Sequence, residues 1–294
     1  MICSVIRMRV LNGCLLGIAA ATLCVIACGL GTMGTGGLTP DEGPEASADA
    51  GIAAPTPEAA PGCAPVVTFT DGLTTIDTTR WLVIKDGSNG DHPKAVTGGE
   101  SPLDGGVVSL VTPGVNNSRG GLWLAMPLPT RAFDVTLSTM IVCKPGCADG
   151  FAVAWVDTTD KSVLDKASSG RTFGIPPGVD GGAMSLDLYK NTESSDPPVP
   201  YLGLLGVEGT KSAGNYAWNA AVTPPTPALI NALHTIALRM RGGTLTVSVD
   251  GTAQTSGAVP SGFSGFFGIT AATGGAAATF LVRDVSASFY DCDP

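Results

Sequence analysis

The side chains able to do chemistry in this 294-residue chain are chiefly carboxylates, because it contains 25 Asp and Glu but only two His. Hydrolysis of a glycosidic bond needs paired carboxyl groups, yet no Glu-x-Asp or Glu-x-x-Glu pattern falls on a predicted strand, and Glu193 and Glu208 fall in predicted loops. A Ser-His-Asp triad would need His92 or His234, and no Gly-x-Ser-x-Gly motif accompanies either. The sequence therefore predicts that the chain is not an enzyme.

The elements that must position these carboxylates are predicted to be short β-strands. Apolar runs of strand length lie between Gly, Pro, Asn and Asp clusters, and the alternation at 133–140 has the period of a half-buried strand. Arg241-Gly242-Gly243 joins two such runs as a hairpin. The predicted strands are 66–70, 107–111, 121–124, 133–140, 151–156, 234–240, 244–249, 263–272 and 278–289, with one short helix at 227–233. This pattern predicts an all-β sandwich or jelly roll.

The first 27 residues are predicted to be a signal peptide. Arg7 and Arg9 precede an apolar run that is too short to span a bilayer. The run ends in Val25-Ile26-Ala27-Cys28, which resembles a bacterial lipobox, so Cys28 would carry acyl chains that hold the mature chain on a membrane. Gly29 follows in place of an Asp, which favours the outer membrane of the cell envelope. An uncleaved membrane anchor is the alternative.

The remaining chain divides by composition. Residues 28–62 are rich in Gly, Ala and Pro and contain no aromatic residue, which predicts a flexible tether, and residues 63–294 are predicted to form one domain. The formal charge of -9 becomes about -11 without Arg7 and Arg9, because residues 1–27 contain no acidic residue. With only 16 Lys and Arg, this acidic chain is not expected to bind nucleic acid.

Several motifs resemble those of L-type (legume-like) lectins and follow the same order along the chain. They lie at 117–123, 133–135, 148–152, 268–274 and 284–289. The resemblance covers about 65–290. It implies a concanavalin A-like β-sandwich, or jelly roll, that binds glycans.

The most specific part of the resemblance is the segment 185–203. An Asp is followed there by an aromatic residue two positions on, an Asn four on and an Asp-Pro nine on. In these lectins the same spacing forms a calcium loop. The resemblance implies carboxylate ligands from Asp187 and Asp196, an amide oxygen from Asn191 and the backbone carbonyl of Tyr189. Hard oxygen ligands of this kind suit calcium.

The same resemblance implies a sugar site around Asp149. This carboxylate would accept hydrogen bonds from two sugar hydroxyls, for which an acceptor-only group is suited, and a cis Ala148–Asp149 peptide would hold it. The Asn191 amide would donate to a hydroxyl, and the Tyr189 ring would stack on the sugar. Backbone contacts are expected from three further residues: Gly170, as a donor, Gly275 and Ala276.

Two residues depart from the pattern of legume members. Those members place a Glu two positions before Asp187 and a His near Asp196-Pro197, where this chain has Ser185 and Tyr201. A neighbouring transition-metal site needs those ligands. We therefore expect calcium and no transition metal.

Four Cys follow the lipobox and allow three pairings. Cys143 and Cys147 bracket a Pro-Gly turn. Cys63 precedes the first predicted strand and Cys292 follows the last, and the terminal strands of the resembled sandwiches are antiparallel neighbours. The prediction is therefore a Cys63–Cys292 and a Cys143–Cys147 disulfide, which export from the cell permits.

Each part of this site has a structural alternative. Asp-Gly occurs six times in the chain, so Asp149-Gly150 alone is typical of a turn. The loop from Asp187 to Asp196 could be an acidic surface loop without an ion. The alternative functions are a structural or adhesion module without a ligand and, less favoured, a glycoside hydrolase of the same fold. The sequence specifies neither the sugar nor the oligomeric state.

Overall fold

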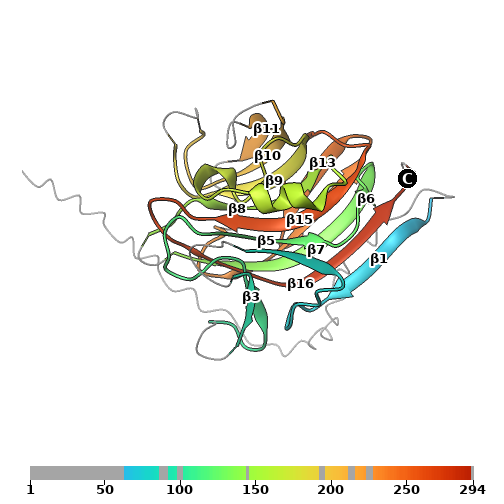
Figure 1. Ribbon diagram of the computed structural model, residues 1–294. Helices are drawn as coiled ribbons and strands as arrows, with labels where there is room; N and C mark the ends of the chain where they lie inside the picture. The colour runs from blue at the N-terminus through green and yellow to red at the C-terminus, as the bar shows by residue number, and fades with distance from the viewer. Residues whose placement is uncertain are drawn as a thin grey trace, which may run out of the picture. The chain divides into compact units, whose positions relative to one another are not determined.

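A computed structural model describes residues 63–85, 92–97, 102–143, 146–191, 196–210, 216–222 and 228–292. This part of the chain forms two antiparallel β-sheets that pack face to face (Figure 1). The predicted all-β sandwich is therefore confirmed. The predicted signal peptide, Cys28 and the tether lie outside the described residues, and the described part contains no helix that is long and apolar enough to cross a membrane.

The first sheet is called the back sheet. Its order is β14 (Thr252–Ala258), β13 (Thr244–Val249), β12 (Leu233–Arg241), β7 (Ala132–Val142), β16 (Thr279–Tyr290), β4 (Val107–Ser109) and β3 (Lys94–Val96), with β1 (Pro65–Asp71) also paired to β16. Inward apolar and outward polar residues alternate along β7 and β12, as expected for a sheet with one buried face.

The second sheet is called the front sheet. Its order is β11 (Ala217–Val222), β10 (Tyr201–Val207), β9 (Gly181–Asp187), β8 (Gly150–Val156), β15 (Ser264–Ala272), β5 (Arg119–Leu124) and β2 (Trp81–Lys85), with β6 (Leu128–Pro129) also paired to β15. Every residue of β8, β9 and β10 is buried. These strands therefore lack the alternation of apolar and polar residues seen in β7.

Both faces of the front sheet are covered. Between the sheets, aromatic rings pack edge to face, with Phe133 5.2 Å from Trp155 and 5.7 Å from Phe267. On the outer face a second apolar cluster includes Leu164 and Phe173. These belong to the connection between β8 and β9, which contains the short 3-10 helices η2 (Lys161–Lys166) and η3 (Gly170–Thr172).

Both predicted disulfides are present. Cys63 pairs with Cys292 across a Cα–Cα distance of 6.0 Å, where β1 and the end of β16 lie antiparallel. Cys143 pairs with Cys147 between β7 and β8 across 4.7 Å. The predicted hairpin also forms, and its two turn residues, Gly242 and Gly243, both have positive φ.

The predicted helix at 227–233 is wrong over its described residues. β12 begins at Leu233, and the residues before it form an irregular loop. Asn231 has a φ of 58°, and its side chain accepts a hydrogen bond from the Cys143 amide at 3.2 Å. The short apolar run serves here as a loop because Asn231 takes the left-handed conformation that would interrupt a helix.

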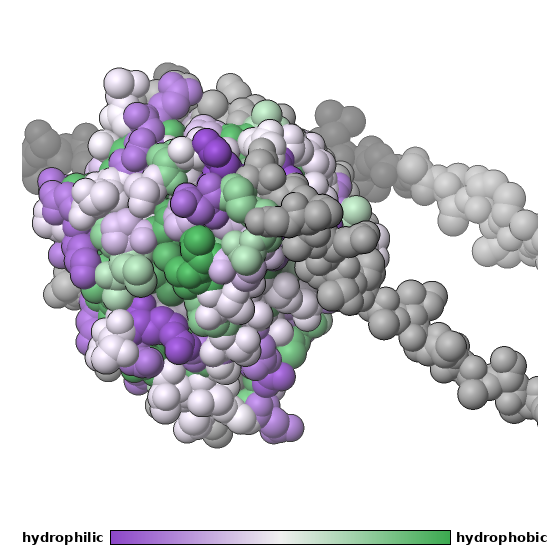
Figure 2. Space-filling view, turned by 90° about the vertical axis from the view of Figure 1, so that its right-hand side faces the viewer, coloured by the Kyte–Doolittle hydropathy of each residue, from purple (hydrophilic) through white to green (hydrophobic). Residues whose placement is uncertain are grey.

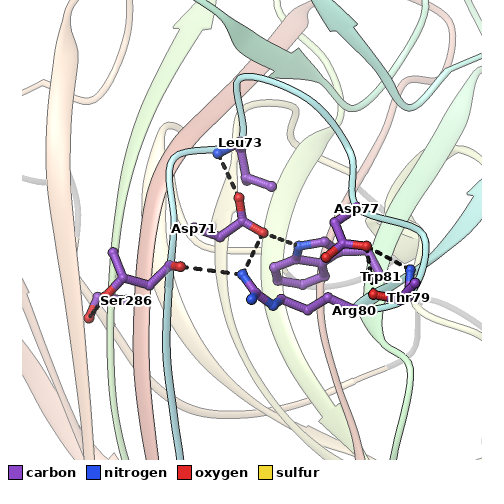
Figure 3. Close-up of polar contacts among 8 residues, drawn as sticks. Asp71, Leu73, Asp77, Thr79, Arg80, Trp81 and Ser286 are labelled. Carbon is purple, nitrogen blue, oxygen red and sulfur yellow. Dashed lines mark hydrogen bonds and ion pairs between the residues drawn. The ribbon is translucent and has the colours of Figure 1, made fainter.

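One carboxylate joins the two sheets at their edge (Figure 3). Asp71 ends β1 in the back sheet and accepts hydrogen bonds from the Leu73 amide at 2.9 Å, Arg80 Nη1 at 3.0 Å and Trp81 Nε1 at 2.9 Å. Trp81 begins β2 in the front sheet and is buried. The guanidinium of Arg80 also lies over the Phe69 ring at 5.3 Å.

A cavity of about 380 Å³ opens beside this contact. Its apolar lining comes from β1 and from the segment 124–128, and includes Phe69, Met126 and Leu128. Figure 2 views the β1 side of the molecule and shows apolar side chains gathered in the middle of this face among polar ones. Leu128 pairs with Gly265 at the start of β15, so the cavity lies at the opposite end of β15 from Ala272.

Replacing Asp71 by Ala should lower the free energy of unfolding by about 2–4 kcal/mol, because the Trp81 indole, the Leu73 amide and the Arg80 guanidinium all lose their shared acceptor. Urea denaturation of both proteins measures the difference. Asp77→Ala is the control, because Asp77 is exposed and its carboxylate accepts from the amide and hydroxyl of Thr79 in the same turn, not from the other sheet. Equal losses for the two variants would contradict the sheet-joining role of Asp71.

Candidate functional site

The predicted site residues converge at one end of the front sheet. Gly150 at the start of β8 pairs with both Asp187, at the end of β9, and Ala272, at the end of β15. Tyr201, at the start of β10, also pairs with Asp187. Three loops therefore meet here: the one containing Asp149, the acidic loop that follows Asp187, and the loop that follows Ala272.

Asp149 is packed between Gly274 and Gly170, a position called the glycine slot below, and one of its oxygens has no partner among the described residues. Its side chain is 4% exposed, and Oδ2 has no hydrogen-bond partner among the described residues. Its amide donates to the Ala272 carbonyl at 3.0 Å, its carbonyl accepts from the Leu188 amide at 2.8 Å, and the Ala148–Asp149 peptide is cis. Burial raises the pKa of Asp149 to about 6. This buried carboxylate oxygen is therefore an acceptor without a donor among the described residues.

Two glycines form the walls of this slot. A Cβ at Gly274 would clash with the carboxylate of Asp149, and one at Gly170 would lie 4.0 Å from Oδ2. A third glycine lies directly after Asp149. Gly150 begins β8 and is packed so closely that a Cβ there would clash with the Leu186 carbonyl and the Phe173 ring. Asp149-Gly150 is therefore a strand start, which excludes the alternative that it is an ordinary Asp-Gly turn.

The acidic loop has its own network. Asp187 is 1% exposed, and its Oδ1 accepts from the Tyr189 amide at 2.9 Å while its Oδ2 accepts from the Tyr201 hydroxyl at 2.8 Å. Asp196 is also buried and accepts from the Asn191 amide at 2.8 Å. Burial raises the pKa of Asp187 to about 7, and the nearby charges of Asp196 and Asp149 add to this effect.

This donor set fits calcium. Two buried carboxylates interact electrostatically, and the two expected neutral ligands are in contact, since Asn191 Nδ2 donates to the Tyr189 carbonyl at 3.3 Å. Among the described residues no group of three or more His, Cys, Asp or Glu could hold a metal. A cation would therefore depend on amide, carbonyl and water oxygens as well, which calcium accepts and softer metals do not favour.

The other predicted sugar-contacting residues lie in the loops around Asp149. Tyr189, two residues after Asp187, is 48% exposed. Gly275 is exposed, and Ala276 packs near Gly146 in the disulfide-closed loop. Gly170 differs from the expectation: its amide donates to the Thr273 carbonyl at 2.9 Å, so it lines the slot without offering the expected backbone donor.

Residues that sequence analysis missed hold the loop after β15. Thr273 is fully buried; its hydroxyl donates to the Val115 carbonyl at 2.8 Å and accepts from the Ser118 amide at 2.8 Å. The Asn116 side chain donates to the Gly275 carbonyl at 3.0 Å. The Thr-Gly-Gly run directly after a buried strand was a visible signal, since small residues permit this close approach.

A His-Asp pair within the described part of the chain lies in the other sheet. His234 Nδ1 is 2.8 Å from Asp250 Oδ2, where β12 meets the turn after β13. Both residues belong to the back sheet, whereas Asp149 and Asp187 belong to the front sheet. The pair therefore contributes nothing to the site.

The described fold is that of the legume lectins. The legume-like lectin family matches residues 86–220, which is less than half of the chain. Lectins bind carbohydrates without converting them, and this match supports the expectation that the chain is not an enzyme. No curated protein sequence matches the chain.

Solved structures of lectins share the architecture at low sequence identity. The exoplasmic/lumenal domain of VIP36, in its Ca2+/Man2-bound form, is 18% identical with a TM-score of 0.57, covering 77% of this chain and 89% of that one. The basic winged bean lectin with Tn-antigen is 19% identical, with a TM-score of 0.57 and coverages of 76% and 97%. The Bauhinia forficata lectin with GalNAc is 17% identical, with a TM-score of 0.56 and coverages of 77% and 100%.

Without calcium, the domain should lose stability as pH rises from about 4 to 8. The pKa values of Asp149 and Asp187 rise from 3.8 in the unfolded chain to about 6 and about 7 in the fold. The folded state therefore holds protons that the unfolded state has released, and ionisation of the folded state costs stability. Melting temperatures in chelator across this range measure the trend, and Asp187→Asn should flatten it. A melting temperature that climbs between pH 5 and 8 would refute the buried state of these acids.

Replacing Gly274 by Ala should displace Asp149 and lower the melting temperature, because the added methyl group would clash with the carboxylate. Gly275→Ala is the matched control at the next residue, where a Cβ has no heavy atom within 4 Å. Thermal unfolding of both variants in chelator, without sugar, checks this difference. If both variants melt at the wild-type temperature, Gly274 does not form a wall of the slot.

Proposed function

We propose that the protein is a carbohydrate-binding lectin whose glycan site is centred on Asp149 and organised by calcium bound at the loop from Asp187 to Asp196. The observation that carries this proposal is the buried Oδ2 of Asp149, partnerless among the described residues, next to a loop that is tied to it through the Leu188 amide and that exposes Tyr189. A sugar offers both matching features, hydroxyl donors and an apolar face.

Each group has a defined task in this proposal. Asp149 accepts from sugar hydroxyls inside the glycine slot, and the Tyr189 ring covers the apolar face of the sugar. Asp187 and Asp196, with the Asn191 side chain and the Tyr189 carbonyl, hold the calcium ion. Bound calcium supplies positive charge next to Asp187, on which the acidic charges of Asp196 and Asp149 act, and it fixes the acidic loop. The Leu188 amide connects the two parts, since it donates to the Asp149 carbonyl.

Proteins of the same fold support the calcium and the glycan together. VIP36 has been crystallised with Ca2+ and mannose, and with Ca2+ and Man2. The expected oxygen ligands are all present in this chain, and Ser185 and Tyr201 replace the Glu and His expected for a transition metal. The proposal therefore includes calcium alone.

The proposal also includes a lipid anchor at Cys28 in the outer membrane. The first described residue, Cys63, lies near the start of β7. Pro65 pairs with Tyr290, and Tyr290 pairs with Ala132, the first residue of β7. The site lies beyond the other end of β7, which is followed by the loop containing Asp149. A tether that joins the domain at Cys63 would leave the glycan site free to face away from the membrane. Mass spectrometry of the mature protein tests the acylation of Cys28.

Asp187→Ala should abolish calcium binding and glycan binding together, whereas Asp149→Ala should abolish glycan binding and leave calcium binding nearly intact. The two variants differ because Asp187 is an expected ligand of the ion and Asp149 is not. A glycan array run with millimolar calcium and again with chelator measures the first property, and calorimetry measures the second. Calcium at a hundredfold excess over its dissociation constant should add about 2.7 kcal/mol to the wild-type stability.

Asp104→Ala is the matched control, because Asp104 belongs to an exposed Asp-Gly pair away from the site. Reproducible glycan binding that this control retains and Asp149→Ala loses would support the lectin. If no glycan on the array is bound with calcium present, the structural or adhesion module is favoured. Release of reducing ends would favour a glycoside hydrolase.

A further inference from the structure

Tyr201 is the direct partner of the most buried carboxylate in the site. It begins β10 and lies opposite Asp187, which ends β9, in the antiparallel register of the front sheet. Both side chains are essentially inaccessible to solvent, and the Tyr201 hydroxyl donates to Asp187 Oδ2 at 2.8 Å. A phenol carries its proton at neutral pH, so the Tyr201 hydroxyl acts as the donor to this carboxylate.

The two oxygens of Asp187 consequently have different roles. Oδ2 is held by Tyr201, whereas Oδ1 accepts from the Tyr189 amide within the acidic loop itself. A carboxylate oxygen has more than one lone-pair site, so Oδ1 can accept this amide and still face a cation. Two bonds in different directions fix the carboxylate plane, and the charged groups that act on Asp187 are both acidic. Its orientation therefore depends on neutral donors.

Ser185 completes this arrangement on the same strand. It lies two residues before Asp187, so both side chains are on one face of β9, and Ser185 is fully buried. Its hydroxyl has no hydrogen-bond partner among the described residues. The positions beside Asp187 thus hold a serine and a phenol, neither of which carries a charge that a second cation would need.

We propose that Tyr201 is the positioning residue of the calcium site: its hydroxyl holds Asp187 Oδ2 so that Oδ1 faces the acidic loop. This inference rests on the calcium loop of the proposed function. It predicts a site for one cation per chain, in which a preformed Asp187 carboxylate reduces the ordering that calcium binding requires.

Tyr201→Phe removes the hydroxyl and keeps the ring. The variant should bind one calcium ion with about tenfold weaker affinity than the full mature wild-type chain, measured by calorimetry, because a hydrogen bond to a charged acceptor is lost. Manganese added to calcium-saturated wild type should produce no second binding event. The matched control is Tyr290→Phe, which removes a phenol that donates to Asp134 Oδ2 at 3.1 Å in the back sheet. Its calcium affinity should equal that of the wild type.

Calcium release provides a measurement that does not require the metal-free variant to fold. Each protein is loaded with excess calcium and mixed with a fluorescent chelator in a stopped-flow instrument. Faster release from Tyr201→Phe than from the wild type and Tyr290→Phe supports the proposal. Equal release rates and equal affinities overturn it, as does a second binding event with manganese in the wild type.

Failure of the proposed function gives a different result. If the wild type binds calcium but no glycan, the lectin proposal fails, and the two Tyr variants still decide the role of Tyr201. If the wild type binds glycans equally well with calcium and with chelator, and calorimetry detects no calcium, then the role of Tyr201 is overturned while glycan binding stands.

Discussion

Three buried carboxylates meet at the end of the front sheet, where the charges that act on Asp187 are acidic, and the arrangement of this end follows from that constraint. Asp149, Asp187 and Asp196 are each more than nine-tenths buried, and the charges of the other two contribute to the raised pKa of Asp187. Burying a carboxylate is costly unless it is hydrogen-bonded, paired or protonated. The loops offset this cost with amide and hydroxyl donors to Asp187 and Asp196, whereas one oxygen of Asp149 has no donor among the described residues.

The fold can hold these groups because the front sheet is covered on both faces. The connection between β8 and β9 covers the outer face with Phe173, and this ring lies against the Cα of Gly150, where no Cβ fits. Strand ends that cannot shift place Asp149 and Asp187 on neighbouring strands, and the Leu188 amide then ties their loops together. Precise placement of a polar site thus depends on the apolar packing beneath it.

The sequence predicted those parts of this architecture in which local pattern and tertiary environment agree. Alternation identified β7 because that strand has one buried and one exposed face. Gly242-Gly243 identified the hairpin because its turn needs positive φ at both residues. β9 and β10 were missed as strands since burial on both faces and internal glycines remove any period. The roles of Gly274 and Thr273 depend on contacts with residues more than a hundred positions away, which no local pattern contains.

Asp71 and Asp187 show why the two ends of the sandwich differ in kind. Each aspartate ends a strand, and each accepts both a backbone amide and an aromatic side-chain donor, the indole of Trp81 or the phenol of Tyr201. Asp71 also has the guanidinium of Arg80 at 3.0 Å, which neutralises it within the protein. Asp187 has acidic neighbours instead, so its negative charge remains available to a cation. At one end of the sandwich, Asp71 is neutralised by Arg80 and joins the two sheets. At the other end, Asp187 has no such basic partner among the charges that act on it, so it can serve as a binding group.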